Sequence, residues 1–212
     1  MPPDAKQNSL GVRQGSPDEK QNSLGVRQGS PDAKQDSLGV RQGSLDLNRV
    51  LRGRVWKFGD SIETDAINPY YRYPTMEELK QHTMEAYRPE FPKEVKPGDI
   101  LVAGRNFGCG SSRPGLVLRE VGIVAIVAES VARLFLRNSI ARAIPIFMAP
   151  GITNIVNDGE TLEVDYPAGI VRNVATGASI ELRKFPPLIE EIFASGGLPE
   201  FAYQRYQRET AR

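Results

Sequence analysis

The part of this sequence best suited to chemistry is residues 104–113, which read Gly-Arg-Asn-Phe-Gly-Cys-Gly-Ser-Ser-Arg. Three glycines within seven residues let the backbone turn sharply and approach a ligand closely, because glycine has no Cβ to oppose a positive φ. The hydroxyls of Ser111 and Ser112 and the guanidinium of Arg113 come at the end of this loop, and such donors suit a carboxylate or a phosphate. The loop therefore predicts a site for a small anion.

The neighbouring residues predict that this loop joins a strand to a helix. Residues 100–103, Ile-Leu-Val-Ala, form an apolar run typical of a short buried strand, and Pro114 suits the first position of a helix. Such a helix would place Ser112 or Arg113 near its N-cap, where backbone N–H groups attract anions. The same spacing also fits a plain tight turn with a capping serine, so both interpretations stand.

Composition places the chain among soluble globular proteins. It has 212 residues, of which 40% are hydrophobic and 25% are charged, with a net charge of +1. This length allows one domain with or without a tail, and the scattered Lys and Arg residues give no basic face for nucleic acid. No apolar run has the length of a transmembrane helix or a signal-peptide core. We therefore expect a cytoplasmic protein with no nucleic-acid and no membrane partner.

Cysteine and histidine are scarce, since Cys109 and His82 are the only ones in the chain. A zinc or iron–sulfur site needs about four such ligands, so we expect this chain to bind no cofactor or metal of its own. Any metal would come from a partner. One alternative is a stand-alone thiol enzyme, in which Arg105 and Arg113 would activate Cys109 and His82 would be the base.

The first part of the chain is a tandem repeat. Residues 3–16, 17–30 and 31–44 read PDAKQNSLGVRQGS, PDEKQNSLGVRQGS and PDAKQDSLGVRQGS. Each copy has too few apolar residues to offset the entropy cost of ordering, so we predict a disordered tail over residues 1–48. A second alternative follows from this segment, namely a non-catalytic interaction protein whose repeats are the functional part.

The remainder predicts an α/β domain over residues 49–198, followed by a loose C-terminal tail over residues 199–212. Apolar runs and turn residues predict strands at 54–58, 100–103, 123–128, 144–148, 161–166, 170–174 and 179–182. Helices are predicted at 75–87, with a capping box from Thr75 to Glu78, and at 115–121, 129–142 and 187–194.

Several motifs occur together and in a fixed order along this domain. They are Gly53-Arg54-Val55, Gly59-Asp60, Thr64-Asp65, residues 95–100, the loop at 104–113, residues 128–138 and Pro145. In these motifs, over about residues 50–196, the chain resembles the small subunit of 3-isopropylmalate dehydratase, an enzyme of leucine biosynthesis, and its relatives in the aconitase superfamily. The resemblance implies a β/β/α swivelling domain of the aconitase type. It also implies a partner, a large subunit that carries a 4Fe-4S cluster.

The resemblance further implies a hydro-lyase whose site is shared between the two subunits, with a role for each matching residue. Ser111 would be the base that removes a proton α to a carboxylate, and Arg113 would bind a substrate carboxylate. Ser112 would donate a hydrogen bond to the substrate or to the alkoxide. Asp65 would position Arg113 or the substrate, which is a small hydroxy di- or tricarboxylate.

Two departures from the family pattern leave the substrate open. Pro114-Gly115 follows the Ser-Ser-Arg motif where Glu-His is common, and residues 68–73 read Asn-Pro-Tyr-Tyr-Arg-Tyr in place of an aliphatic loop. Because this loop is the expected substrate-selecting segment, we expect Arg72 to contact the part of the substrate that varies. Isopropylmalate is the first choice, and homoaconitate or a dimethylmalate is the alternative.

Overall fold

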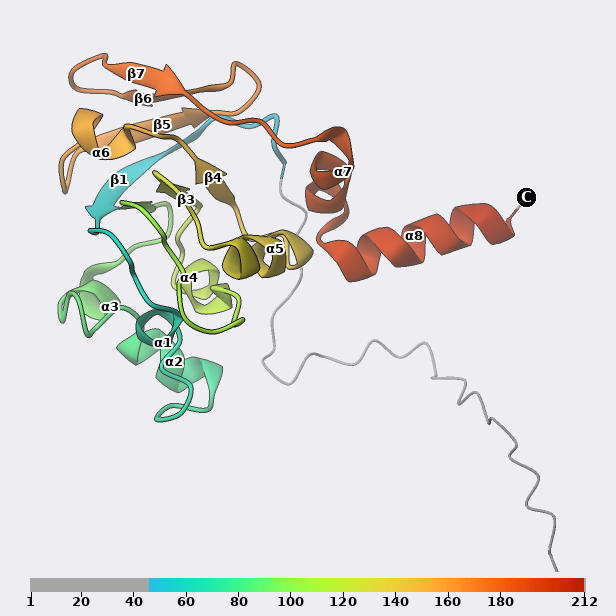
Figure 1. Ribbon diagram of the computed structural model, residues 1–212, viewed down its shortest axis with the longest axis horizontal. Helices are drawn as coiled ribbons and strands as arrows, with labels where there is room; N and C mark the ends of the chain where they lie inside the picture. The colour runs from blue at the N-terminus through green and yellow to red at the C-terminus, as the bar shows by residue number, and fades with distance from the viewer. Residues whose placement is uncertain (1–45, 212) are drawn as a thin grey trace, which may run out of the picture. The chain divides into compact units, whose positions relative to one another are not determined.

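The computed structural model of the protein describes residues 46–211 (Figure 1). The predicted disordered tail, residues 1–48, therefore lies outside the described residues except for its last three. Of these three, Leu47 is only 9% exposed and packs into a hydrophobic core cluster. The folded domain thus already includes Leu47, two residues before the predicted boundary.

The described chain forms one seven-stranded mixed sheet. Its strand order is β4-β3-β2-β1-β5-β6-β7, in which β1 to β4 are parallel neighbours and β5 to β7 add antiparallel to the other side of β1. The strands are β1 Leu51–Lys57, β2 Ile100–Ala103, β3 Ala125–Ala128, β4 Ile146–Met148, β5 Thr161–Asp165, β6 Ile170–Asn173 and β7 Ser179–Glu181. All seven predicted strands are confirmed, with ends that differ by up to three residues.

Eight helices accompany the sheet in the described part of the chain. They are α1 Thr64–Ile67, α2 Met76–His82, α3 Phe91–Glu94, α4 Leu116–Glu120, α5 Arg133–Ala141, α6 Ile152–Ile155, α7 Pro187–Ser195 and α8 Leu198–Thr210. The predicted capping box is confirmed, because Thr75 Oγ1 accepts the Glu78 N–H at 3.3 Å and the Glu78 carboxylate accepts the Thr75 N–H at 3.1 Å. Helix α2 nevertheless ends at His82, five residues before the predicted end.

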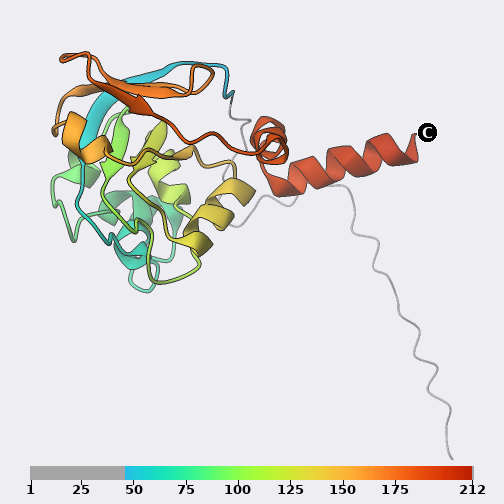
Figure 2. The same ribbon diagram turned by 45° about the horizontal axis from the view of Figure 1, so that its top comes forward.

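Two hydrophobic clusters divide the fold into β/β/α layers. Alternate residues of the parallel strands point to opposite faces, so Leu101 joins the cluster under α1 to α5 whereas Ile100 and Val102 join the other. That second cluster contains Leu162 and Val171 of β5 and β6, which shows that the antiparallel strands cover this face. Figures 1 and 2 show β5 to β7 and helices α1 to α4 on opposite sides of the parallel strands. The predicted α/β class and β/β/α arrangement are confirmed.

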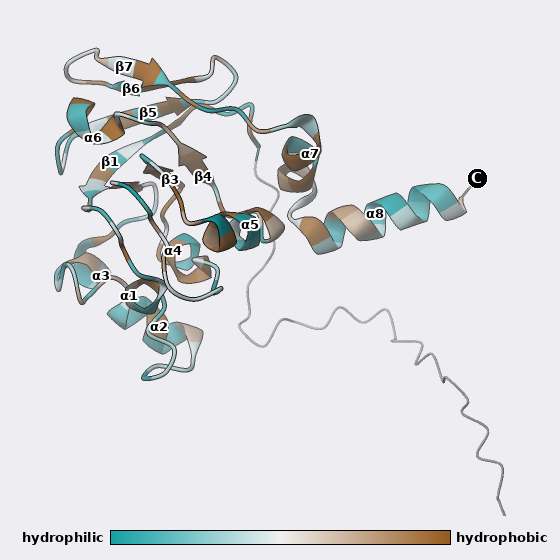
Figure 3. Ribbon diagram, viewed as in Figure 1, coloured by the Kyte–Doolittle hydropathy of each residue, from teal (hydrophilic) through white to brown (hydrophobic). Residues whose placement is uncertain are grey.

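The C-terminal segment differs from its prediction. Residues 199–212 were expected to be loose, but Leu198–Thr210 form α8, which has no buried residue and places polar side chains along most of its length (Figure 3). After Pro199 the sequence has no Gly or Pro to interrupt a helix, and Arg205 pairs with Glu209 at 3.1 Å across one turn. Local propensity was thus underestimated in a segment that lacks an apolar stripe.

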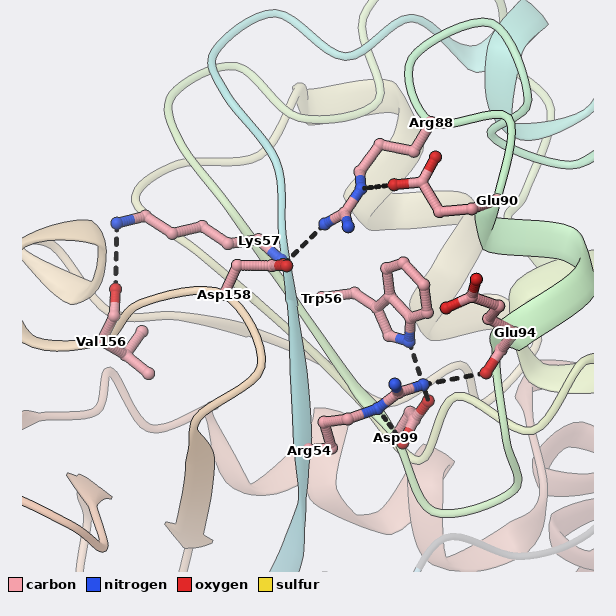
Figure 4. A network of polar contacts seen from close by, with 9 residues as sticks. All are labelled: Arg54, Trp56, Lys57, Arg88, Glu90, Glu94, Asp99, Val156 and Asp158. Atoms are coloured by element: carbon pink, nitrogen blue, oxygen red, sulfur yellow. Dashed lines mark hydrogen bonds and ion pairs between the residues drawn. The ribbon is translucent and has the colours of Figure 1, made fainter.

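A buried polar network holds the start of β2 against β1 (Figure 4). The Asp99 carboxylate is 5% exposed and accepts hydrogen bonds from Arg54 Nη2 at 2.8 Å, Trp56 Nε1 at 2.8 Å and the Lys96 N–H at 2.9 Å. The guanidinium groups of Arg54 and Arg88 lie 4.8 and 4.5 Å from the centre of the Trp56 ring. The network therefore fixes where β2 begins relative to its neighbour β1.

Burial of Asp99 disfavours its charged form, but the hydrogen bonds from Arg54, the Lys96 N–H and Trp56 outweigh this and lower the pKa of Asp99. Because the folded-state pKa lies below the unfolded one, this group stabilises the fold above the unfolded pKa. The contribution disappears as the pH falls below about 4 and through the folded pKa.

We expect Asp99→Asn to lower the free energy of unfolding at neutral pH by about 1.5–3 kcal/mol, because charge-assisted hydrogen bonds are removed. Urea unfolding at about pH 7 and about pH 3 would measure this, and the difference from the wild type should shrink at the lower pH. Glu77→Gln, which removes an exposed ion pair with Lys80, is the control and should cost less than about 0.5 kcal/mol. Equal effects of the two substitutions would contradict the role given to Asp99.

Candidate active site

The glycine-rich loop lies beside the segment that leaves β1. Because β1 and β2 are parallel neighbours, their carboxyl ends meet at one edge of the sheet, and the two following segments run side by side. Five backbone hydrogen bonds join these segments, from Gly104 N to Gly59 O at 3.1 Å, Ser61 N to Arg105 O at 2.7 Å, Gly108 N to Ile62 O at 2.8 Å, Cys109 N to Ile62 O at 3.2 Å and Thr64 N to Cys109 O at 2.8 Å. This edge is where open α/β sheets commonly bind ligands.

Two glycines of the loop are required by their surroundings as well as by their backbone. Gly108 has φ +76°, and a Cβ there would lie 2.3 Å from the Phe135 ring of α5. Gly110 has φ +102°, and a Cβ there would lie 3.1 Å from Thr64 Oγ1. The prediction that these glycines permit a sharp turn is therefore confirmed, and their closest neighbours are Phe135 and Thr64 of the protein itself.

Thr64 holds Ser111. The Thr64 side chain is fully buried, and its Oγ1 accepts the Ser111 N–H at 2.8 Å and lies 2.9 Å from Ser111 Oγ. Ser111 itself is half-buried, in contrast to the fully buried Thr64. The hydroxyl of Ser111 is thus fixed relative to the first turn of α1.

The next residue of α1, Asp65, holds Arg113. Arg113 Nη1 donates to Asp65 Oδ1 at 3.1 Å, and its guanidinium lies 4.4 Å from the centre of the Tyr71 ring and 5.4 Å from that of Tyr70. In the described part of the chain, Arg113 makes no further hydrogen bond or ion pair, so its other N–H groups are available to a ligand. The predicted contact between Asp65 and Arg113 is present.

Ser112 and the start of the following helix differ from expectation. The Asn138 side chain of α5 donates to the Ser112 carbonyl, and Asn68 Nδ2 donates to the Pro114 carbonyl at 2.7 Å. Helix α4 begins at Leu116 with Gly115 as its N-cap, within one residue of the helix predicted at 115–121. Arg113 thus lies two residues before the N-cap, and Pro114 precedes the helix instead of taking its first position. Ser112 is exposed in the loop.

Arg72 lies in the loop between α1 and α2, with an exposed side chain that makes no ion pair to any described residue. Its neighbour Tyr71, whose ring lies over Arg113, is 82% exposed. Tyr73 stacks on His82 with ring centres 3.7 Å apart and so faces α2. The structure thus brings Ser111, Arg113 and Asp65 together, whereas the exposed Arg72 side chain forms no hydrogen bond or ion pair with these three residues in the described part of the chain.

Sequence reasoning missed Thr64, Asn68 and Asn138. Thr64 precedes Asp65 in the Thr-Asp motif, and that adjacency was a usable signal because both residues begin the same helical turn. The asparagines gave no signal, since each acts through a carbonyl about 26 or 46 residues away in sequence.

The residues of the thiol alternative have separate partners. Cys109 Sγ donates to the Ile62 carbonyl at 3.6 Å, whereas Nδ1 of His82, the last residue of α2, lies 2.6 Å from Oε2 of Glu85 in the turn that follows. No hydrogen bond joins Cys109 to His82 in the part of the chain that the structure describes. A cysteine–histidine pair for nucleophilic catalysis is therefore not assembled here.

The side chains that could bind a metal ion are dispersed over the described domain. Nowhere in residues 46–211 do three or more His, Cys, Asp or Glu side chains gather closely enough to hold a metal ion. These residues do not fit an iron–sulfur cluster, which needs several thiolates. Within the same range, no helix has the length and apolarity needed to span a membrane.

The geometry agrees with what comparison with known proteins shows. The family described as the aconitase C-terminal domain matches residues 45–150, a range that includes β1 to β4 and the glycine-rich loop. The chain belongs to the aconitase C-terminal domain family.

Named relatives within this aconitase family are small subunits. The isopropylmalate/citramalate isomerase small subunit of Methanocaldococcus jannaschii is 46% identical over 156 residues, which cover 72% of this chain and 93% of that protein. The 3-isopropylmalate dehydratase small subunit of Thermodesulfovibrio yellowstonii is 42% identical and covers 75% of this chain and 97% of that protein. The methanogen homoaconitase small subunit of Methanothermobacter thermautotrophicus is 44% identical, with coverages of 70% and 88%.

A solved structure supports the same assignment of the aconitase-type fold. The crystal structure of a 3-isopropylmalate dehydratase from Methanocaldococcus jannaschii superimposes with a TM-score of 0.71 at 36% identity. The match covers 77% of this chain and 99% of that one. The aconitase-type swivelling domain inferred from the sequence motifs is therefore confirmed.

We expect Gly110→Ala to destabilise the domain by more than backbone strain alone, because the new Cβ would press on Thr64 Oγ1. Gly98→Ala is the matched control, since Gly98 has φ +101° and nothing within 4 Å of its Cβ position. Left-handed strain should cost each variant about 1–2 kcal/mol in urea unfolding, with a further decrease only in Gly110→Ala. Equal decreases in the free energy of unfolding of the two variants would show that the added Cβ does not press on Thr64, which would contradict the prediction.

Proposed function

We propose that this chain is the small subunit of a hydro-lyase acting on a small hydroxy di- or tricarboxylate, with isopropylmalate as the first candidate substrate. The family membership and the names of the relatives support the reaction class. The assignment of roles to individual residues is our proposal from the geometry of the loop.

One observation carries this assignment. The consecutive residues Thr64 and Asp65 hold Ser111 and Arg113 through separate hydrogen bonds, at 2.9 and 3.1 Å. A hydroxyl and a guanidinium are thereby presented from one short loop, two residues apart. This spacing suits a substrate in which an acidic C–H lies next to a carboxylate.

Ser111 is the proposed base. Its oxygen would take the proton α to the carboxylate, so that the C–H bond breaks and an O–H bond forms on Ser111 Oγ. A serine hydroxyl is a poor base unless its alkoxide is stabilised by nearby donors. Arg113 donates one N–H to Asp65, and its other N–H groups bond no residue of the range 46–211. Those groups would bind the carboxylate next to that carbon, and the exposed Ser112 hydroxyl would donate to the substrate or alkoxide.

The iron–sulfur cluster of the proposed enzyme belongs to a separate large subunit. When bound there, a 4Fe-4S cluster supplies a Lewis acid for the hydroxyl that leaves the substrate. This chain would contribute the proton acceptor and the carboxylate donors, and its exposed site edge would be closed by that subunit. The name small subunit, shared by the relatives, supports a heteromeric complex.

Several related hydroxy acids are candidate substrates within this class. The relatives' names include isopropylmalate, citramalate and homoaconitase, so similar chains serve different hydroxy acids. Homoaconitate or a dimethylmalate is therefore the alternative substrate. The polar and aromatic loop at residues 68–73 is the feature that would distinguish them.

The decisive experiment is co-purification from the native host followed by assay of the complex on isopropylmalate, homoaconitate, citramalate and a dimethylmalate. Ser111→Ala should assemble normally and lower kcat by about 10²–10⁴-fold, the usual contribution of a general base. Ser179→Ala, on the edge strand β7, is the control and should keep full activity. Near wild-type turnover by Ser111→Ala would contradict the assignment of the base.

The loop at residues 68–73 gives a second prediction. We expect Arg72→Leu to change the ratio of kcat/KM between two hydroxy acids by an amount worth about 1–3 kcal/mol, because Arg72 is an exposed cation in the proposed substrate-selecting loop. Tyr71→Leu should lower kcat/KM on every substrate alike, since its ring supports Arg113. An unchanged ratio in Arg72→Leu would move the selecting role to Pro114-Gly115.

A further inference from the structure

We propose that Thr64 is a positioning residue whose hydroxyl donates a hydrogen bond to the alkoxide of Ser111. This inference rests on the proposed function, because it assumes that Ser111 is the base. It gives a catalytic purpose to a buried hydroxyl that otherwise serves only to shape the loop.

The first argument is the hydrogen-bonding capacity of the Thr64 hydroxyl. A hydroxyl has one proton to donate and two lone pairs that accept. One lone pair of Thr64 Oγ1 accepts the Ser111 N–H at 2.8 Å. Within residues 46–211, the proton of Thr64 has one hydrogen-bond partner, Ser111 Oγ at 2.9 Å.

The second argument is the direction of that bond when the charge changes. With Ser111 neutral, either oxygen can donate to the other. With Ser111 as an alkoxide, Ser111 has no proton left, so Thr64 alone can donate. The bond between the two hydroxyls thus becomes charge-assisted in the reactive state, and such bonds are roughly twice as strong as neutral ones.

The third argument is that Thr64 is immobile before any charge develops. Its side chain is 0% exposed, its N–H donates to the Cys109 carbonyl at 2.8 Å, and its Oγ1 accepts the Ser111 N–H at 2.8 Å. A buried β-branched side chain has a restricted χ1. A donor fixed in advance needs no reorganisation at the moment of reaction, and this is the property that makes oxyanion-type donors effective.

The other polar groups near Ser111 face the substrate side of the loop in the proposed mechanism, whereas Thr64 does not. Ser112 is exposed, and Arg113 is held by Asp65 and the ring of Tyr71. Thr64 is the buried member of this group, on the protein side of Ser111. During proton transfer Thr64 forms and breaks no covalent bond and keeps its own proton.

The test uses the reconstituted complex with its large subunit. Thr64→Val, which keeps the shape and removes the hydroxyl, should lower kcat by about 10²–10³-fold with KM changed by less than about threefold. The pH at which kcat/KM levels off should rise, because the alkoxide no longer has this donor. Thr64→Ser should restore kcat to within about tenfold of the wild type, with the wild-type pH profile.

Thr83→Val is the matched control for removal of a buried threonine hydroxyl. Thr83 is also 0% exposed, and its hydroxyl donates to the Ile67 carbonyl at 2.8 Å, with no bond to the loop. It should be destabilised comparably and keep kcat and the pH profile. If Thr64→Val does not fold, Thr64→Cys, whose thiol is a weak donor, should fall well below Thr64→Ser in kcat.

The outcomes separate this inference from the proposed function. If Ser111→Ala is inactive while Thr64→Val matches the wild type in kcat and pH profile, the role of Thr64 is overturned and the proposed function stands. An equal decrease of kcat in Thr64→Val and Thr83→Val, with no change in either pH profile, also overturns it. A wild-type complex that turns over none of the hydroxy acids would refute the proposed function and this inference together.

Discussion

The candidate site depends on the parallel pairing of β1 with β2. Because the two strands run in the same direction, the segments that leave them emerge at one edge and can exchange hydrogen bonds along residues 59–64 and 104–109. The middle of the glycine-rich loop is also held by the segment after β3, where Phe107 N donates to the Ser130 carbonyl at 3.0 Å and Ala132 N to the Phe107 carbonyl at 2.9 Å. The buried network around Asp99 and Trp56 keeps the two strands in register, so its effect extends to the opposite end of β2.

Rigidity and access are divided between two neighbouring residues. Thr64 is buried and holds the backbone and hydroxyl of Ser111 from inside, whereas Asp65 is exposed and holds the guanidinium of Arg113 from outside. The part of the loop that carries Ser111 is thus bound to the buried Thr64. The half that must meet a substrate keeps free N–H groups and an aromatic neighbour that remains largely solvent-exposed, Tyr71.

Elements with strong local signals were predicted well. The strands and the capping box of α2 follow from apolar runs and from a Thr and a Glu three residues apart, which depend on near neighbours alone. The helix predicted at 115–121 agrees with α4 within one residue, but Pro114 lies before the helix, and its carbonyl accepts a hydrogen bond from Asn68, a residue 46 positions earlier in the chain. Helix α8 was missed because it has no apolar stripe to reveal it.

By itself the sequence determined the fold class, the family and the loop that carries Ser111 and Arg113, because glycine spacing, apolar periodicity and ordered motifs are properties of the chain. Only the tertiary structure decided which groups surround that loop. Thr64 lies 47 residues before Ser111, and Asp65 lies 48 before Arg113. Contacts over such separations depend on which strands become neighbours in the sheet, and no local pattern encodes that choice.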